Sequence, residues 1–250
     1  PDALQEAVDG LTALDATAPI HIHIAEQTGE VDACLAWSGQ RPVQWLLNHA
    51  PVDARWCLVH ATHMDADEYR RAAQSGAVAG LCPTTEANLG DGIFDMGQWR
   101  AGRGHWGVGS DSHVTVNAAE ELLMLEYSQR LATRQRNVLA GDRHAYVATA
   151  MTLDAVAGGA QASGRAVAGL AVGQQADLVV LDAEHPLLQG LPTADAMLSA
   201  HEFASHRRSA IAEVWVGGQA RVSAGRHTLN LSARAAFNTA RRQLLEDTQA

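Results

Sequence analysis

Short apolar runs alternate with longer amphipathic segments along the first 111 residues of the chain. Each run has the length of a strand, is rich in β-branched or aromatic residues, and is bounded by glycine, proline or charged residues. Four such runs predict β-strands: "PIHIHIA" (19–25), "RWCLVHA" (55–61), "AVAGLCP" (77–83) and "HWGVGSD" (105–111). Because helix-like segments separate these runs, the pattern predicts a parallel sheet with right-handed crossovers.

The segments between the runs carry helix signals. An opening helix is predicted within residues 1–19, and further helices are predicted over 30–39, 41–50 and 64–76. In the last of these, Asp65 has the character of an N-cap, Glu68 follows at the spacing of a capping box, and Gly76 stands where a helix ends. The remaining connection, 84–104, is glycine-rich and is expected to be less regular.

The pattern changes near residue 165. Before it, a long helix is predicted over 117–137, and more helical sequence extends to about Gly164. After it, two strand-turn patterns have glycines at their turns, at 169–183 and 211–227. An amphipathic helix is predicted near the end, at 231–247. We therefore expect a boundary between two structural units near residue 165.

Ionisable residues recur at the carboxyl ends of the predicted strands. His21, His23 and Glu26 end the first run, His60 ends the second, and Asp111 ends the fourth. The carboxyl ends of parallel strands face one side, where barrels and doubly wound sheets place their chemistry. Imidazole and carboxylate are good ligands for a divalent ion. Such an ion makes bound water nucleophilic near neutral pH, and a further carboxylate can transfer its protons. The set favours metal-assisted hydrolysis.

Composition limits the classes of partner and compartment. The formal net charge of −10 argues against a nucleic-acid backbone as the main partner, and a small molecule is expected instead. No apolar run reaches 18 residues and no signal peptide is visible, so we expect no membrane span and a cytoplasmic location. Cys34, Cys57 and Cys82 lie far apart without a CxxC pair, which is typical of reduced thiols.

Three strand-end strings, "HIHIAE", "LVHATH" and "GVGSDS", resemble the amidohydrolase superfamily of metal-dependent (β/α)8 hydrolases. The resemblance implies that His23 and Asp111 bind the metal and that Glu26, His60 and Asp111 are catalytic. It implies one divalent metal as cofactor, with zinc favoured. The string "GLAVGQQADLVVLD" (169–182) is similar to a segment of the small β-sandwich of that superfamily.

The pair His21 and His23 admits a second alignment, because superfamily members carry an H-x-H pair on their first strand. Too few strand-like runs lie between His23 and Asp111 for a first and an eighth strand, since a full barrel takes about 250 residues. We therefore expect an α/β fold that is the C-terminal half of a (β/α)8 TIM-like barrel, with strands five to eight in 1–165. Part of a small β-sandwich is expected in 166–228 and a C-terminal helix in 229–250. The two first-strand ligands are then not in this chain, which is expected to be a fragment.

Within the superfamily, "HIHIAEQ", "CPTTEANLGDGIFD" and "GSDSHVTVNAAEELLMLEYSQRL" most resemble the formimidoylglutamate deiminase family. That resemblance implies conversion of N-formimino-L-glutamate and water to N-formyl-L-glutamate and ammonia in histidine degradation. The alternatives are another deaminase or chlorohydrolase of the superfamily, acting on a purine, pyrimidine or triazine, and an inactive fragment without the first-strand ligands. A doubly wound fold with a chance histidine cluster is disfavoured by the sandwich-like segment.

Several residues stay unassigned at this stage. His21 is expected to be a hydrogen-bonded interior histidine, while His63, Glu86 and His113 have no predicted role. The residues that bind the substrate are not identified, and they are expected in the part that precedes this chain. A homodimer remains open.

Overall fold

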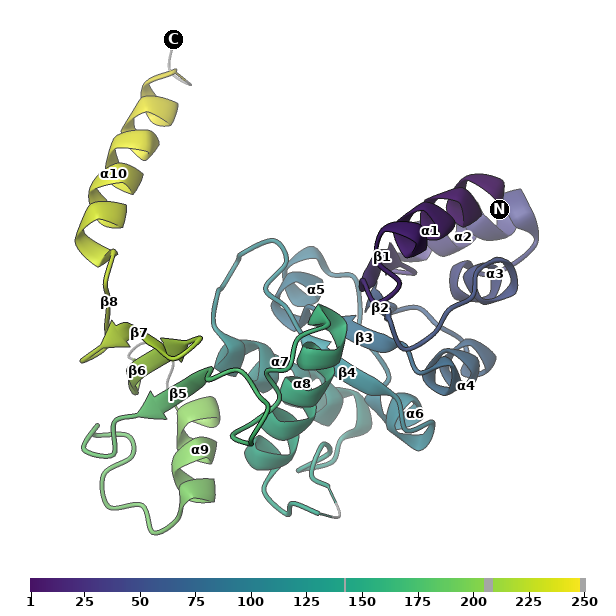
Figure 1. The fold of residues 1–250 in the computed structure, drawn as a ribbon. Helices are drawn as coiled ribbons and strands as arrows, with labels where there is room; N and C mark the ends of the chain where they lie inside the picture. Colours follow the sequence, from purple (N-terminus) through teal and green to yellow (C-terminus); the bar gives the residue numbers. More distant parts are fainter. Residues whose placement is uncertain (142, 205–208, 248–250) are drawn as a thin grey trace.

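The computed structural model describes residues 1–141, 143–204 and 209–247. Its first sheet has four parallel strands in the order β1-β2-β3-β4 (Figure 1). The strands are β1 (Ile20–Ile24), β2 (Trp56–His60), β3 (Val78–Leu81) and β4 (His105–Val108). All four strands were predicted, and the expected α/β fold with a parallel sheet is confirmed.

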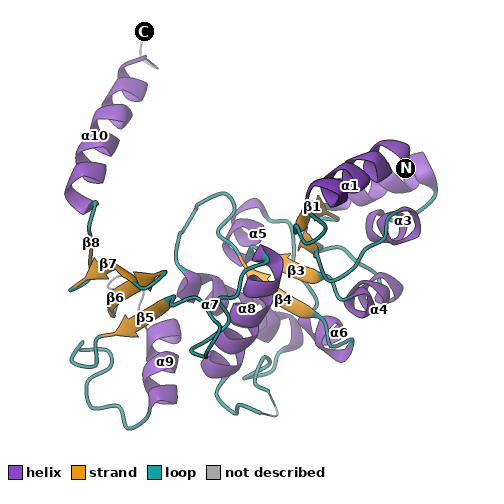
Figure 2. Cartoon of the chain, in the orientation of Figure 1, coloured by secondary structure: helices purple, strands orange, loops and turns teal. Residues whose placement is uncertain are grey.

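Helices precede the sheet and join its strands (Figure 2). They are α1 (Asp2–Leu14), α2 (Thr28–Ser38), α3 (Pro42–His49), α4 (Ala66–Ser75), α5 (Pro83–Leu89), α6 (Met96–Ala101), α7 (Ala118–Thr133) and α8 (Val147–Ser163). Helices α5 and α6 lie in the connection that the sequence predicted to be irregular. Pro83 occupies the first turn of α5, where its missing N–H is harmless, and the Asp95 side chain caps α6 by accepting from the Gln98 amide.

The predicted cap of α4 is confirmed. The Asp65 side chain accepts from the amides of Asp67 and Glu68, and the Glu68 side chain accepts from the Asp65 amide. Gly76 ends the helix with a φ of 85°, a conformation that costs glycine little. The same Glu68 carboxylate accepts from Arg41, so the cap also ties α4 to the start of α3.

The hydrophobic core lies around the two central strands. Strands β2 and β3 are almost fully buried along their lengths, as is usual for parallel strands covered on both faces. Large side chains from strands and helices fill this core, among them Trp56, Leu58, Leu81, Phe94, Met96, Trp99 and Met151. The core therefore fixes the central strands whose carboxyl ends carry the candidate site.

The amino ends of the strands are closed by the last turn of α8. The Gln161 side chain donates to the carbonyls of Ala54 and Gly76, which precede β2 and β3. His21 donates from Nε2 to the carbonyl of Ala162, at 2.8 Å. These contacts satisfy polar groups at one end of the sheet with protein partners.

The second sheet is antiparallel, in the order β5-β6-β7-β8, and comprises Leu178–Leu181, Ile211–Val216, Gln219–Ser223 and Arg226–His227. Helix α9 (Ala194–Phe203), which the sequence did not predict, packs against α7 and α8. Helix α10 (Asn230–Asp247) extends away from both sheets in Figure 1. Residues 248–250 of the predicted C-terminal helix lie outside the described residues, and the predicted boundaries at 165 and 228 stay predictions.

No helix among the described residues is both long enough and apolar enough to cross a membrane.

Candidate active site

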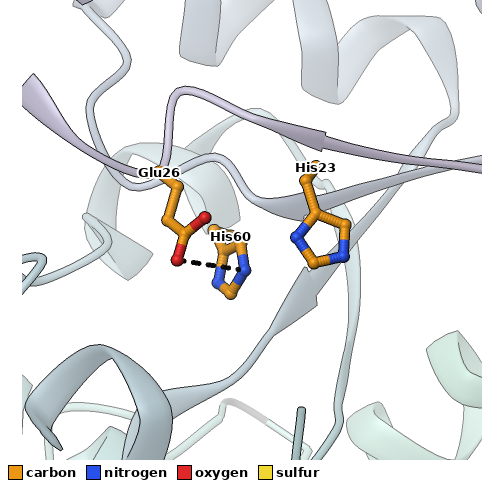
Figure 3. A group of neighbouring side chains, drawn as sticks. All are labelled: His23, Glu26 and His60. Carbon is orange, nitrogen blue, oxygen red and sulfur yellow. Dashed lines mark ion pairs between the residues drawn. The ribbon is translucent and has the colours of Figure 1, made fainter. Parts of the chain in front are cut away.

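The register of the parallel sheet brings three predicted catalytic residues together. Ile24 of β1 pairs with His60 of β2, so Glu26, two residues beyond Ile24, lies beside the His60 ring. The Nε2 atom of His60 is 3.7 Å from Glu26 Oε1 and 3.7 Å from Asp111 Oδ2 (Figure 3 draws the Glu26 contact). Acids from the ends of two strands thus face one imidazole nitrogen.

His23 lies on the other side of this imidazole in Figure 3. The rings of His23 and His60 meet edge to face, with centroids 5.0 Å apart. Ligand atoms of His23, Glu26 and His60 all lie within 4.8 Å of one another, and those of His60, Cys82 and Asp111 do so as well. The predicted metal ligands His23 and Asp111 thus belong to two groups that share His60, and their pairing on one metal stays a prediction.

The backbone at the strand ends is strained. Ala25, His60 and Asp111 have φ values of 50°, 64° and 42°, in a region that residues other than glycine seldom occupy. Such strain persists only where the surrounding structure enforces it, and it concentrates at functional sites. Here the turns from strand to loop bring the side chains of Glu26, His60 and Asp111 together.

Glu30 enforces one of these turns, and the sequence reasoning missed it. Its carboxylate oxygens accept from the amides of Ala25 and Glu26, at 2.7 and 2.8 Å. The signal in the sequence was a second glutamate in the first turn of α2, four residues after Glu26, where a carboxylate can bind free amides. Glu30 therefore holds the backbone from which Glu26 projects.

Glu86, unassigned from the sequence, contacts the Nδ1 side of His60. Its Oε1 lies 3.3 Å from His60 Nδ1 and also accepts from the Cys82 amide at 3.0 Å. His60 is fully buried, and burial by itself lowers its pKa. The hydrogen bond to Glu86 and the charges of Glu26, Glu86 and Asp111 outweigh burial, so the pKa of His60 is raised above its ordinary value.

Cys82 is the remaining buried group of the site. Burial, first, and the nearby carboxylates of Glu86 and Asp111 raise the pKa of its thiol, which favours the neutral form. A neutral buried thiol is a poor nucleophile. In its neutral form, the Cys82 thiol therefore contributes packing to the site.

The donor set fits a divalent metal. The buried Nε2 of His60 has no hydrogen-bond partner among the described residues, although two carboxylates lie 3.7 Å away. A buried polar nitrogen without a partner is costly, and imidazole and carboxylate together are the ligands that zinc prefers. The described residues thus include two groups able to hold a metal ion.

The other three histidines that the sequence singled out lie outside this cluster. His21 is hydrogen-bonded as predicted, but it is exposed rather than interior. His63 donates from Nε2 to the Asp91 carbonyl, so it joins two loops beside the site. His113 is exposed in the loop after Asp111.

Comparisons with known proteins identify relatives of this chain. A sequence model described as the amidohydrolase family matches residues 1–221. Formimidoylglutamate deiminase of Pseudomonas aeruginosa is 52% identical over 209 residues, which is 84% of this chain and 46% of that protein. A 5-methylthioadenosine/S-adenosylhomocysteine deaminase of Natronomonas pharaonis is 29% identical over 98% of this chain and 54% of that protein.

Solved structures show the same fold. The crystal structure of an amidohydrolase from Brucella melitensis has a TM-score of 0.88 and 48% identity, covering 95% of this chain and 52% of that one. An adenosine deaminase from Xanthomonas campestris, solved with bound zinc, has a TM-score of 0.84 at 23% identity. The match covers 99% of this chain and 55% of that one. The chain spans about half the length of the curated relatives it matches. By sequence and by fold, the chain belongs to the amidohydrolase family.

Proposed function

We propose that the protein at its full natural length hydrolyses N-formimino-L-glutamate to N-formyl-L-glutamate and ammonia. The sequence likeness to formimidoylglutamate deiminase supports this substrate. The observation that carries the proposal is the convergence of Glu26 and Asp111 on one nitrogen of the buried His60. This arrangement supplies two carboxylates and an imidazole at one point, as hydrolysis of a C=N bond requires.

One divalent ion, with zinc favoured, completes the proposed site. His23 and Asp111 would hold it, together with ligands from outside this chain, because two protein ligands are too few for a tight zinc site. Bound there, the ion supplies Lewis acidity and makes a water molecule nucleophilic near neutral pH.

Each residue of the chain then has a defined task. Asp111 accepts a proton from the attacking water, whose oxygen forms a bond to the formimino carbon, while Glu26 delivers a proton to the imine nitrogen. The remaining proton of the new hydroxyl group then passes to Asp111, and Glu26 delivers a second proton to the same nitrogen. The C=O bond forms as the C–N bond breaks and ammonia leaves, and the two protons held by Asp111 in turn replace those given by Glu26. His60 Nε2 faces both acids and orients the water between them.

An ammonia-release assay on the full-length, zinc-loaded protein tests this proposal. We expect the highest kcat/KM with N-formimino-L-glutamate and no ammonia from N-formyl-L-glutamate, which lacks the imine and serves as the matched control. Faster release from 5-methylthioadenosine, or from another purine, pyrimidine or triazine, would replace the substrate and keep the family. Absence of ammonia from all of them despite bound zinc would overturn the hydrolytic function.

Two expectations about the whole protein remain predictions. These are the cytoplasmic location and the homodimer that the sequence leaves open. Size-exclusion chromatography with light scattering measures the second.

A further inference from the structure

The Glu86 side chain lies inside the protein, at the Nδ1 edge of the His60 ring, whereas Glu26 and Asp111 lie at Nε2. The Glu86 side chain is 6% exposed and the His60 side chain is fully buried. Glu86 comes from the first turn of α5, whereas His60 ends β2, so the contact joins two successive strand-end loops. The proposed reaction assigns no task to this carboxylate.

The hydrogen bonds indicate which nitrogen of His60 carries the proton. Glu86 Oε1 accepts from the Cys82 amide and lies 3.3 Å from His60 Nδ1, so Nδ1 must donate to it. In the neutral ring, the lone pair is then on Nε2. That atom is the one which faces Glu26 and Asp111 without a hydrogen-bond partner of its own.

We propose that Glu86 is the positioning residue of this site, which keeps the proton of His60 on Nδ1 and leaves the Nε2 lone pair to accept from the water that His60 orients. The proposal rests on the hydrolytic function proposed above. Without an acceptor at position 86, the imidazole can rotate or place its proton on Nε2, where a hydrogen instead of a lone pair would face the water.

A neighbouring carboxylate offers a matched control. Glu121 of α7 accepts from the amide and hydroxyl of Thr84, two residues before Glu86, and is also buried. It therefore anchors the same turn of α5, but its hydrogen bonds to Thr84 do not reach His60. Loss of the Glu121 acceptor loosens α5 in the way that loss of Glu86 does, without removing the partner of Nδ1.

The experiment compares Glu86→Met, Glu86→Gln and Glu121→Met in the full-length protein. Methionine removes the acceptor at similar volume, whereas glutamine keeps an oxygen for both donors. Zinc affinity is measured by competition with a chelator, and folding is measured by thermal unfolding. The position of the proton on His60 is measured by ¹⁵N NMR of the histidine side chains, and a His60→Asn variant assigns the signal.

We expect Glu86→Met to lower zinc affinity by roughly 10- to 100-fold, the usual effect of losing an outer hydrogen-bond partner at a metal site, because His60 contacts both proposed ligands, Asp111 and His23. Its His60 should lose the Nδ1–H form that the wild-type protein shows. Glu86→Gln should restore most of both properties, and Glu121→Met should keep zinc affinity and proton position at the wild-type level despite a lower unfolding temperature.

Three outcomes overturn the proposal. They are a wild-type His60 with its neutral proton on Nε2, a folded Glu86→Met protein with unchanged zinc affinity, and an equal loss of affinity in Glu121→Met. None of these measurements uses a substrate. Failure of the protein to hydrolyse N-formimino-L-glutamate would therefore count against the proposed function and not against the role of Glu86.

Discussion

The two ends of the parallel sheet treat polar groups in opposite ways. At the amino ends, Gln161 donates to the carbonyls of Ala54 and Gly76, and His21 donates to the carbonyl of Ala162. At the carboxyl ends, Nε2 of the buried His60 faces two carboxylates and has no hydrogen-bond partner among the described residues. Hydrogen bonds within the chain close one end, whereas the other presents groups that a ligand can use.

The backbone shows the same contrast. Positive φ values occur at Ala25, His60, Ala61 and Asp111, at or just after the carboxyl ends of strands, and at Arg103 just before β4. In the middle of β4, α8 packs closely on the strand, with Gly107 against Gly159 and Gly158 against Trp106. The concentration of positive φ values at the carboxyl ends indicates that this end is organised for chemistry, whereas the close packing of α8 on β4 serves stability.

The largest expected effect concerns the carboxyl end. Glu26→Gln should lower turnover by at least about 100-fold, because a general acid contributes that much or more. Ammonia release by the full-length protein measures it, with zinc content determined for each preparation. Asp32→Asn, at an exposed carboxylate of α2, is the control that should keep wild-type turnover. Near-normal turnover of a fully metallated Glu26→Gln protein would remove Glu26 from the acid role.

A change in the close contact between α8 and β4 should affect folding and not chemistry. A Cβ on Gly158 would lie 1.9 Å from the Trp106 carbonyl oxygen, so Gly158→Ala forces β4 and α8 apart. We expect a loss of about 3 kcal/mol in unfolding free energy, at the upper end of overpacking effects. Denaturant unfolding measures this loss.

The adjacent glycine is the matched control. A Cβ on Gly159 meets nothing within 4 Å, so Gly159→Ala should stabilise the helix by roughly 0.5–1 kcal/mol. Equal effects of the two substitutions would show that the close approach of Gly158 to β4 is not a determinant of stability.

A buried acid away from both ends tests whether an unpartnered polar atom always marks a functional site. Glu202 of α9 is 2% exposed, accepts a hydrogen bond from Thr152, and leaves its Oε2 without a partner. Burial, opposed by the Thr152 hydrogen bond, raises the pKa of Glu202 to about 7, whereas the unfolded carboxyl titrates near 4.5. Between these values the unfolded state releases the proton and the folded state keeps it, so stability falls as pH rises through this window.

The expected cost above the folded pKa is at most about 3 kcal/mol relative to low pH. Glu202→Gln should abolish this part of the pH dependence, as urea unfolding at about pH 5 and about pH 8 would reveal. Turnover at a fixed pH should not change, because Glu202 is remote from the site. Identical pH dependence in both proteins would mean that Glu202 is not protonated in the folded state.

An effect smaller than that of Gly158→Ala is expected at the closure of the amino end. Gln161→Met removes the hydrogen bonds to the carbonyls of Ala54 and Gly76 and the one with His105 Nδ1. It should cost about 2 kcal/mol, since each bond contributes roughly 0.5–1.5 kcal/mol and two of the three are exposed. Thermal unfolding measures it, and kcat should remain at the wild-type value. A fall in kcat without loss of stability would mean that the two ends are coupled.

Local signals made much of the fold predictable from the sequence. The alternation of apolar and polar residues located all four parallel strands, and the spacing of Asp65 and Glu68 located the start of α4. The connection containing α5 and α6 was misjudged because its glycines suggested a loop, while Pro83 and the cap at Asp95 favour helices. Helix α9, which packs on α7 and α8, was missed although Thr193 caps it by accepting from the Ala196 amide.

The candidate site divides in the same way. The sequence by itself determined that His23, Glu26, His60 and Asp111 stand at strand ends, because strand period and length are local properties and parallel strands end on one side. Only the tertiary structure decided that Glu86 contacts His60 and that Gln161 closes the far end of the sheet. Those contacts join residues 26 and 107 positions apart, and no local pattern specifies which distant side chain a folded backbone will bring within hydrogen-bond distance.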